Sequence, residues 1–561
     1  MVQKIVQTTA VILVFALGGV ASADVPGVKR AKLIGHGWDI LASSPAEVIE
    51  NAEAFDESGL DGIAVVVAGR KPNGETYNMR RVWQETGWTK EMFSEHLPYL
   101  KQFRDHRGLK DSLIMVWFAP RTRICWQDDA AWANFARNMG LMAGLAREGG
   151  LKGLVVDNED YGNARQWRYD AKKDKASYDE ICELARRRGR EIARATFGEY
   201  PDMSLMFFWL LSQCQDYFSE ANPVAAVRER GDLWPAFVNG ILDETPATAK
   251  LIDGNEDYWC QAADGDFFRQ YWYLRNGVLA QVAPENRAKY LTVLSIGVGH
   301  FLDVYTSRSR EETCWYFGPA ENGSRLSAFQ HNLEQSLDVA DDYVWIYGQE
   351  HALINWKKDA RHASAGKDPR FDKVRAAGKY TWEDALPGFT DTLKMKRHAA
   401  AMAKAAFDAD DRNGRAGDAL PKGPWQFWQH PSNSHGTNGL DAQDRAGNAA
   451  EPSLVASNVA QGGFLKYVKV VPGQKFALGG WMKGTGGSIS VSWKRKGESV
   501  HALLPIKAQF PATDSSEWRR GLISFCVPPG VDTMNVAAWL HHNEGTGQVT
   551  KFSDIRLVEI K

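Results

Sequence analysis

The chain has 561 residues, a formal net charge of −2 at pH 7, and many large aromatic side chains, with 21 Trp and 17 Tyr. This length is too great for one compact core and indicates two domains or more. The near-zero charge argues against a general nucleic-acid binder, which is usually clearly basic. The six cysteines lie far apart without a C-x-x-C pair, which argues against a zinc ribbon or a redox motif, and we expect most of them to be free buried thiols.

The first 23 residues have the features of a secretory signal peptide. A short basic start, Met1–Lys4, precedes the apolar run Val11–Val20, and Ala21-Ser22-Ala23 fits the cleavage rule. The apolar run is too short to span a membrane. We therefore expect residues 1–23 to be removed and the mature protein to be secreted, to the extracellular space or the periplasm, without a membrane span.

From residue 24 to residue 395, short apolar runs alternate with longer amphipathic stretches. The expected strands are 32–40, 62–69, 112–120, 151–157, 203–212, 250–253, 291–303 and 343–347, and the expected helices include 44–58, 89–106, 129–148, 177–197, 266–282 and 325–341. Ser44 and Ser177 are good N-cap residues. Eight strands that alternate with helices indicate an α/β fold of parallel β/α units, and we expect a (β/α)8 TIM-type barrel over 24–395. A doubly wound open sheet is the alternative.

The pattern changes near residue 395. A helical stretch over 393–407 gives way to a polar, Gly-rich segment, so residues 396–424 are expected to form a helix end and a linker. Residues 425–561 carry short runs that alternate apolar and polar residues and are separated by turn signals such as Pro472-Gly473. This pattern predicts an all-β sandwich, or jelly roll.

In a TIM barrel the active site lies at the carboxyl ends of the strands, so the residues after each apolar run are the candidates for a site. Carboxylates and tryptophans are frequent there. The candidates for catalysis are Glu159, Asp157, Glu256 and Glu350, and the candidates for substrate binding are His36, Trp38, Asp39, Arg121, Arg123, Trp209, Trp259, His300 and Tyr347. Two carboxylates and flat aromatic faces are what the cleavage of a glycosidic bond needs.

Asp157 and Glu159 follow the fourth apolar run. They are two residues apart on an extended chain and therefore point to the same face. A close pair of carboxylates raises the pKa of one member, which keeps a general acid protonated near neutral pH. We predict Glu159 as the catalytic acid and Asp157 as its partner; the alternative is that Asp157 only caps a helix or pairs with an arginine.

The segment Gly153-Leu-Val-Val-Asp157-Asn-Glu159-Asp-Tyr161 resembles the strand-four signature of chitinase-type hydrolases, which ends in Asp-x-Glu with the Glu as acid. It departs from that signature at Val155, where the family usually has another Asp. The same residues resemble the Asn-Glu end of strand four in the clan of retaining β-glycosidases, whose nucleophile is a Glu on a later strand. Both resemblances give Glu159 the role of acid. Segments 253–256, 283–290 and 343–348 also resemble uncharacterised exported bacterial proteins.

The second carboxylate is expected to be Glu256 or Glu350. Glu256 follows a short apolar run beside Tyr258 and Trp259, whereas Glu350 ends a stronger strand. Either carboxylate could instead pair with an arginine for structural reasons. An acetamido group of the substrate, oriented by Asp157, is a further alternative for the nucleophile.

The second and third apolar runs, which would be neighbours in a barrel, are followed by the basic residues Arg70, Lys71, Arg80, Arg81, Arg121 and Arg123. Arginine binds sulfate and carboxylate groups with two hydrogen bonds, which favours a sulfated or uronate-bearing polysaccharide. The alternative is that these arginines balance the site's own carboxylates. No metal-ligand spacing is present in the barrel, H-E-x-x-H is absent, and no cofactor is expected.

The C-terminal sandwich resembles carbohydrate-binding modules of the jelly-roll type, through residues 467–483 and 552–559. This resemblance covers most of 425–561 and implies either carbohydrate binding or support of the barrel. The candidate stacking residues are Trp425, Trp428, Trp493 and Trp539, and Asp554 is a candidate ligand for a structural calcium ion.

Together these features predict a secreted glycoside hydrolase that cleaves a polysaccharide or oligosaccharide by a two-carboxylate acid/base mechanism, with no nucleic-acid partner. The alternative is a non-catalytic secreted glycan-binding protein with a degenerate barrel. In the enzyme, Glu159 faces Glu256 or Glu350 across the barrel at about 5–10 Å. An esterase or a sulfatase is disfavoured because no nucleophilic Ser or Cys motif is present.

Overall fold

The structure of the protein is a computed structural model. It describes residues 31–70, 76–77, 82–83, 87–120, 122–160, 164–218, 220–256, 264–306, 325–357, 381–397, 399–431, 436–442, 445, 452–500, 505–511, 514–528, 530–543 and 546–560. The chain divides into two compact units, one formed by Ala31–Ala320 and Ser324–Arg397 and one that contains His398–Lys561. The predicted signal peptide and the candidates Arg121 and Trp259 lie outside the described residues.

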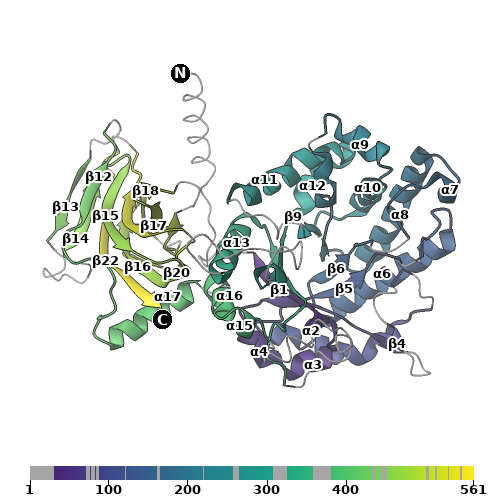
Figure 1. Ribbon diagram of the computed structural model, residues 1–561, viewed down its shortest axis with the longest axis horizontal. Coiled ribbons are helices and arrows are strands. Elements are labelled where there is room, and N and C mark those ends of the chain that lie inside the picture. The colour runs from purple at the N-terminus through teal and green to yellow at the C-terminus, as the bar shows by residue number, and fades with distance from the viewer. Residues whose placement is uncertain are drawn as a thin grey trace. The chain divides into compact units, whose positions relative to one another are not determined.

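A nine-stranded parallel sheet forms the centre of the first unit (Figure 1). Its strands are β1 (Lys32–Gly37), β2 (Gly62–Val65), β5 (Leu113–Trp117), β6 (Gly153–Asp157), β7 (Ser204–Phe207), β8 (Lys250–Asp253), β9 (Leu294–Ile296), β10 (Val298–Phe301) and β11 (Tyr343–Gly348). Their order across the sheet is β10-β11-β1-β2-β5-β6-β7-β8-β9. Only Gly297 separates β9 from β10, so the two ends of the sheet are consecutive in the chain and the sheet nearly closes into a barrel. The predicted parallel β/α architecture is confirmed, and the run 291–303 contains two strands instead of one.

Both faces of this sheet are apolar because both are covered, which explains the near-continuous apolar runs in the sequence. One face packs against the helices, and the other fills the interior of the barrel. The interior cluster contains Ile34, Ala64, Leu113, Met115, Val155, Met206, Phe208, Ile252, Tyr343 and Trp345.

The helices of the first unit follow the strands along the chain. They are α2 (Trp38–Leu41), α3 (Pro45–Glu50), α4 (Ala52–Asp56), α5 (Leu97–Leu100), α6 (Asp129–Gly149), α7 (Ala171–Asp174), α8 (Tyr178–Glu199), α9 (Pro223–Glu229), α10 (Trp234–Glu244), α11 (Asp264–Arg275), α12 (Arg287–Val293), α13 (Arg325–Val339), α15 (Trp382–Ala385) and α16 (Phe389–Arg397). The long helix α8 packs against both α6 and α10. Ser44 and Ser177 form capping boxes with Glu47 and Glu180, as their N-cap positions predicted.

The prediction of one continuous α-helix over 89–106 is wrong. The chain forms the 3-10 helix η2 (Lys90–His96), the single turn α5 and a second 3-10 helix, η3 (Phe103–Asp105). Pro98 lies in the first turn of α5. Proline lacks the N–H that a helix interior needs, so it favours a helix start at this point and breaks a continuous helix.

The second unit is built on two antiparallel sheets. One sheet contains β12 (Gln426–Gln429), β15 (Gly462–Lys469), β17 (Gly487–Arg495), β18 (Glu498–Ser499), β19 (Ile506–Lys507) and β21 (Thr533–Leu540), and the other contains β13 (Thr437–Asp441), β14 (Ser453–Ser457), β16 (Lys475–Gly484), β20 (Arg519–Cys526) and β22 (Val549–Ile560). Residues from both sheets form one hydrophobic core, as expected for a sandwich. A short separate pair, β3 (Gly69–Arg70) and β4 (Thr76–Tyr77), belongs to the first unit.

Helix α17 (Ala399–Arg412) belongs to the sandwich unit and packs on β16, β20 and β22 (Figure 1). Its Ala403 and Phe407 are buried against Ala477 and Val558. The guanidinium of Arg556 pairs with Asp410 at the C-terminal end of this helix. The helical stretch 393–407 is therefore two helices, α16 in one unit and α17 in the other.

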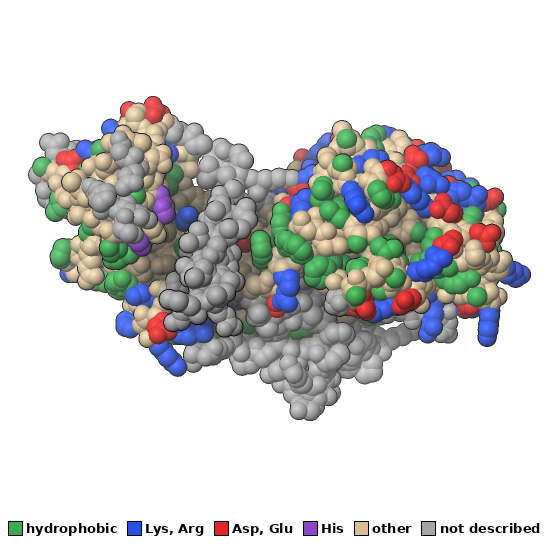
Figure 2. Space-filling view, turned by 90° about the horizontal axis from the view of Figure 1, so that it is seen from above, with side chains coloured by type: hydrophobic (Ala, Val, Ile, Leu, Met, Phe, Trp, Pro, Cys, Tyr) green, Lys and Arg blue, Asp and Glu red, His purple; other side chains and the backbone are tan. Residues whose placement is uncertain are grey.

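In the view of Figure 2, charged side chains of both signs are interspersed over the described surface of the barrel unit. None of the helices in the described part of the chain has the length and apolar character needed to cross a membrane. Cys125, Cys182, Cys214 and Cys526 are free thiols, and two of them are buried.

Candidate functional site

Alternation along the strands decides which side chains face the interior of the barrel. Val155 and Trp345 belong to the interior cluster, so Asp157 and Tyr347, two residues further along the same strands, face the same way. The inward-facing side chains nearest the carboxyl ends of the strands are His36, Trp117, Asp157, Phe208, Phe301 and Tyr347. We call this set the barrel mouth.

Aromatic rings form one continuous wall of the mouth. The His36 ring stacks on Tyr347, with centroids 5.0 Å apart and planes at 24°, and meets Phe208 edge-on at 5.4 Å. Phe301 stacks on the other side of Tyr347 at 5.5 Å. Phe208 lies parallel to Trp345 at 4.4 Å, which joins the wall to the interior of the barrel. These contacts fix the orientation of rings that come from four different strands or strand ends.

The Tyr347 hydroxyl accepts two hydrogen bonds. The indole Nε1 of Trp38 donates at 2.6 Å and the side-chain amide of Gln349 donates at 3.0 Å. Burial raises the pKa of the Tyr347 hydroxyl, and the charges of Asp303 and Glu159 act in the same direction. Tyr347 therefore remains a neutral hydroxyl at physiological pH, and Glu159 lies near enough to influence it electrostatically.

His36 contributes an uncharged imidazole to the mouth. Its side chain is buried, and burial lowers the pKa of His36 to about 3. Within the described residues its Nδ1 has no hydrogen-bond partner. At neutral pH the ring can accept or donate one hydrogen bond to a group that enters the mouth.

The carboxyl end of β6 presents Asp157 and Glu159. The Asp157 carboxylate is buried and accepts the backbone N–H of Glu159 at 2.9 Å, which fixes the turn between the two residues. The intervening Asn158 points to β7 and donates to the backbone oxygen of Trp209 at 2.9 Å. Asn158 thereby ties the ends of β6 and β7 together, and Glu159 is left partly exposed at the mouth.

Two acidic residues lie at the carboxyl end of β8. Asp253 has a structural role, and Glu256 is a candidate for catalysis. Asp253 is fully buried and accepts the backbone N–H groups of Leu211 and Ser212, both at 2.8 Å, so it anchors the loop after β7. Glu256 follows and donates its backbone N–H to the carbonyl of Phe208 at 3.2 Å. Glu256 is partly exposed and attached to the segment that carries the aromatic wall.

Asp303 fixes the chain around Glu350. Its two carboxylate oxygens accept the backbone N–H groups of Gln349 and Glu350, each at 2.9 Å. Burial raises the pKa of Asp303 to about 7, the charge of Glu350 adds to this rise, and the two hydrogen bonds oppose it. Asp303 ends the run 291–303 but was not among the site residues predicted from the sequence. A carboxyl that titrates near neutral pH beside a partly exposed carboxylate is a feature of functional sites.

Two residues predicted to bind substrate face away from the mouth. The buried Asp39 carboxylate accepts the backbone N–H of Leu353 at 2.9 Å and the indole N–H of Trp356 at 3.0 Å, so it anchors the chain after β11. His300 lies on the helix side of β10, where its Nε2 is 2.7 Å from the Ser336 hydroxyl of α13. Burial lowers the pKa of His300 to about 3.

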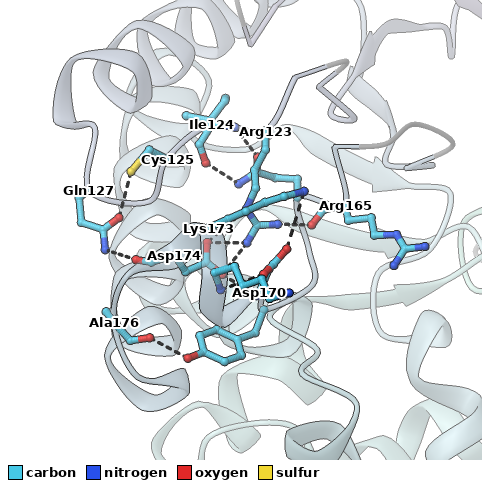
Figure 3. Close-up of polar contacts among 12 residues, drawn as sticks. Arg123, Ile124, Cys125, Gln127, Arg165, Asp170, Lys173, Asp174 and Ala176 are labelled. Carbon is cyan, nitrogen blue, oxygen red and sulfur yellow. Dashed lines mark hydrogen bonds and ion pairs between the residues drawn. The ribbon is translucent and has the colours of Figure 1, made fainter.

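Arg123 forms an ion pair with the buried Asp174 (Figure 3). Its Nη2 lies 2.7 Å from one Asp174 oxygen and 2.8 Å from the other, and its Nε donates at 3.2 Å. Its Nη1 donates to the backbone oxygen of Arg165. The structure therefore does not bring Arg123 together with the residues of the mouth, and the Arg123 guanidinium holds the loops after β5 and β6.

Of the predicted site residues, the structure brings together His36, Trp38, Asp157, Glu159 and Tyr347, with Trp209 and Glu256 at the ends of β7 and β8 and Glu350 after β11. Among the residues that the structure describes, no group of three His, Cys, Asp or Glu side chains could hold a metal ion. In the sandwich, the Asp554 carboxylate accepts a hydrogen bond from Arg415 at 3.1 Å.

No family model matches the chain, and no curated protein matches it. Solved structures give partial matches. A 3-keto-D-glucoside 4-epimerase from E. coli matches with a TM-score of 0.30 and 11% identity, over 62% of this chain and 100% of the epimerase. The enzymatically active domain of tailspike protein 4 from bacteriophage CBA120 matches with a TM-score of 0.21 and 19% identity, over 26% of this chain and 22% of that chain. A CBM4 structure matches with a TM-score of 0.19 and 13% identity, over 24% of this chain and 86% of that chain. These TM-scores are low, so the fold described above rests on the strand pairing.

Proposed function

We propose that the protein is a secreted glycoside hydrolase that cleaves a polysaccharide at the barrel mouth. The observation that carries this proposal is the juxtaposition at the end of β6. There, Asp157 faces inward, Glu159 is partly exposed two residues later, and the Glu159 charge acts on the hydroxyl of Tyr347 in the aromatic wall. Carboxylates beside flat rings are the groups that sugar binding and glycosidic cleavage require.

In this proposal Glu159 is the general acid that protonates the leaving oxygen. Asp157 holds the backbone of Glu159 in place through the hydrogen bond at 2.9 Å and adds a negative charge next to it. A neighbouring negative charge raises the pKa of a carboxylic acid and favours its protonated form. The Tyr347 hydroxyl, which keeps its proton, supplies a neutral hydrogen-bonding group within electrostatic reach of Glu159.

The second carboxylate is Glu256 or Glu350. Glu256 is attached to the Phe208 end of the wall, and Glu350 is held next to Asp303. Either one would attack the anomeric carbon or activate a water molecule. The half-buried rings of Trp38, Trp117 and Trp209 would stack on sugar rings that extend from the bond to be cleaved.

The proposal is tested with purified full-length protein on neutral, sulfated and uronate-bearing polysaccharides, with released reducing ends as the readout. The variants are Glu159→Gln, Glu256→Gln and Glu350→Gln. Glu199→Gln on α8 is the matched control, because its carboxylate is half exposed and pairs with Arg147 at 3.7 Å. We expect release by the wild type and by the control, and loss of at least about 100-fold in Glu159→Gln and in one of the other two variants.

Equal release by the wild type and Glu159→Gln would place the acid elsewhere. No release from any polysaccharide, with retention of the protein on one of them, would favour a non-catalytic glycan-binding protein. The polymer that the wild type cleaves also tests the predicted preference for anionic substrates. Arg123 does not support this preference, because its guanidinium is paired with Asp174.

A further inference from the structure

We infer, on the basis of the hydrolysis proposed above, that Glu350 is its second carboxylate and that the buried Asp303 is the residue that positions it. Glu159 follows β6, and Glu350 follows β11. Across the sheet, β1, β2 and β5 lie between β11 and β6 on one side, and β7, β8, β9 and β10 lie between them on the other. Because the sheet nearly closes, these two strand ends lie on opposite sides of the barrel mouth.

The competing carboxylate, Glu256, follows a strand that lies close to β6. Only β7 separates β8 from β6, and the backbone N–H of Glu256 is bound by the carbonyl of Phe208 at the end of β7. Glu256 and Glu159 therefore lie on the same side of the mouth. An acid and a nucleophile or base must flank the glycosidic bond, so the order of the strands favours Glu350 as the group that works with Glu159.

Asp303 continues the pairing of β10 with β11 through its side chain. Phe301 on β10 is in register with Tyr347 on β11, and Asp303 lies two residues further along the chain. There its two carboxylate oxygens accept the backbone N–H groups of Gln349 and Glu350, each at 2.9 Å. Hydrogen bonds from adjacent N–H groups to one carboxylate fix the orientation of the backbone, and with it the direction in which the Glu350 side chain leaves the chain.

Two further acceptors fix the segment that follows Glu350. The buried Asp39 carboxylate accepts the Leu353 N–H at 2.9 Å, and the side-chain oxygen of Asn51 accepts the Lys357 N–H at 2.7 Å. The chain is thus held by side chains from the first and the last parts of the barrel. A carboxylate on a segment that is fixed before the substrate arrives loses little conformational entropy in reaching the reacting carbon.

Electrostatic effects connect Asp303 and Glu350 with the proposed acid. The charges of Asp303 and Glu159 both contribute to the raised pKa of the Tyr347 hydroxyl. The charge of Glu350 in turn contributes to the raised pKa of Asp303. Tyr347 therefore lies within electrostatic reach of Glu159 and of the residue that holds Glu350, so the two halves of the proposed site meet at this ring.

The test uses the full-length protein and a polysaccharide that the wild type cleaves, with kcat and KM measured from released reducing ends. The variants are Glu350→Gln, Glu256→Gln and Asp303→Asn. Asp39→Asn is the matched control for Asp303→Asn, because Asp39 is also buried, accepts an N–H of the same segment at 2.9 Å and faces away from the mouth. Urea denaturation gives the folded fraction of each variant, so that the rates are compared per folded molecule.

We expect Glu350→Gln to lose about 100-fold or more in kcat, and Glu256→Gln to lose far less. Asp303→Asn replaces one acceptor oxygen by an NH2 group that faces a backbone N–H. It should lose about tenfold or more in kcat at nearly unchanged KM, because a displaced catalytic group slows the reaction without weakening the binding of substrate. Asp39→Asn should lose stability and retain its kcat.

Sodium azide distinguishes a direct role of Glu350 from a structural one. In Glu350→Ala, azide should attack the anomeric carbon in place of the missing carboxylate, while the bond to the leaving oxygen breaks and Glu159 protonates that oxygen. The product is a glycosyl azide, which mass spectrometry detects. Glu256→Ala should form none.

Loss of activity in Glu256→Gln with an active Glu350→Gln would overturn the inference and leave hydrolysis with Glu159 as the acid in place. An Asp303→Asn variant with the kcat of Asp39→Asn would remove the positioning role of Asp303. A wild type that cleaves no polysaccharide, or that Glu159→Gln equals in rate, would contradict the proposed function and this inference with it.

Discussion

The indole N–H of Trp38 donates to the hydroxyl of Tyr347 at 2.6 Å and joins the first strand of the barrel to the last. β1 and β11 are neighbours in the sheet, with His36 in register with Tyr347. The Tyr347 hydroxyl therefore accepts hydrogen bonds from Trp38 and Gln349, while the Tyr347 ring forms the centre of the aromatic wall. Through His36 and Phe301, Tyr347 therefore links β11 to both of its neighbouring strands at the mouth.

Tyr347→Phe should lower both activity and stability. The variant removes the acceptor of two hydrogen bonds, which corresponds to a loss of about 1–3 kcal/mol in the free energy of unfolding. Urea denaturation and reducing-end assays measure the two effects. Tyr200→Phe is the control, because its hydroxyl donates to the Leu151 carbonyl at 2.9 Å away from the mouth. We expect Tyr200→Phe to lose stability and retain activity; a Tyr347→Phe enzyme with full activity would contradict the role of this hydroxyl.

Asp303 should make folding stability depend on pH. Its pKa in the folded protein is about 7, raised from 3.8, so the folded state binds a proton between these values that the unfolded state has released. This contribution to stability is therefore fully present below about pH 4 and is lost as the pH rises through 7. At about 1.4 kcal/mol per pKa unit, it amounts to at most about 4 kcal/mol.

The difference in unfolding free energy between the wild type and Asp303→Asn, measured from pH 4 to pH 8, isolates this effect. The buried neutral His36 and His300 contribute a slope of the opposite sign below pH 6.5 in both proteins, so they cancel in the difference. We expect the advantage of the wild type to shrink as the pH rises. A difference that is constant with pH would show that Asp303 does not titrate in this range.

Arg123→Met should destabilise the protein without changing its affinity for substrate. The variant leaves the Asp174 carboxylate, which is 2% exposed, without its cationic partner. Removing one partner of a buried ion pair typically costs about 3–5 kcal/mol. Adding Asp174→Asn to the same protein should restore part of the loss. Normal stability with a raised KM would instead assign Arg123 to substrate binding.

The sequence was sufficient to predict the parallel barrel strands, because each is a short apolar run between polar segments. β8 matches its predicted bounds, Lys250–Asp253. The break at Gly297 was not predictable from the apolar pattern, since both halves of the run are equally apolar. The 3-10 structure at 90–96 is not evident from the amphipathic pattern, which continues through Pro98 although this proline breaks a continuous helix.

The site was only partly predictable, because strands that are apolar on both faces do not reveal which face is inward. His300 and Phe301 are adjacent at the end of β10, and only the latter faces the mouth. Asp39 and Asp303 each lie near the end of an apolar run in the sequence, but their carboxylates accept hydrogen bonds from different segments of the fold. Trp428 and Trp539 meet through β15, and the pairing of these non-consecutive strands cannot be derived from local patterns.

The most direct test of the central claim compares kcat/KM of the wild type and Glu159→Gln on two substrates of the same sugar. One is the polysaccharide that the wild type cleaves, and the other is a dinitrophenyl glycoside, whose leaving group departs without protonation. If Glu159 is the general acid, the variant should lose about 100-fold or more on the polysaccharide and far less on the dinitrophenyl glycoside. Equal losses on both substrates, or no loss on the polysaccharide, would contradict the assignment of Glu159 as the catalytic acid of a glycoside hydrolase.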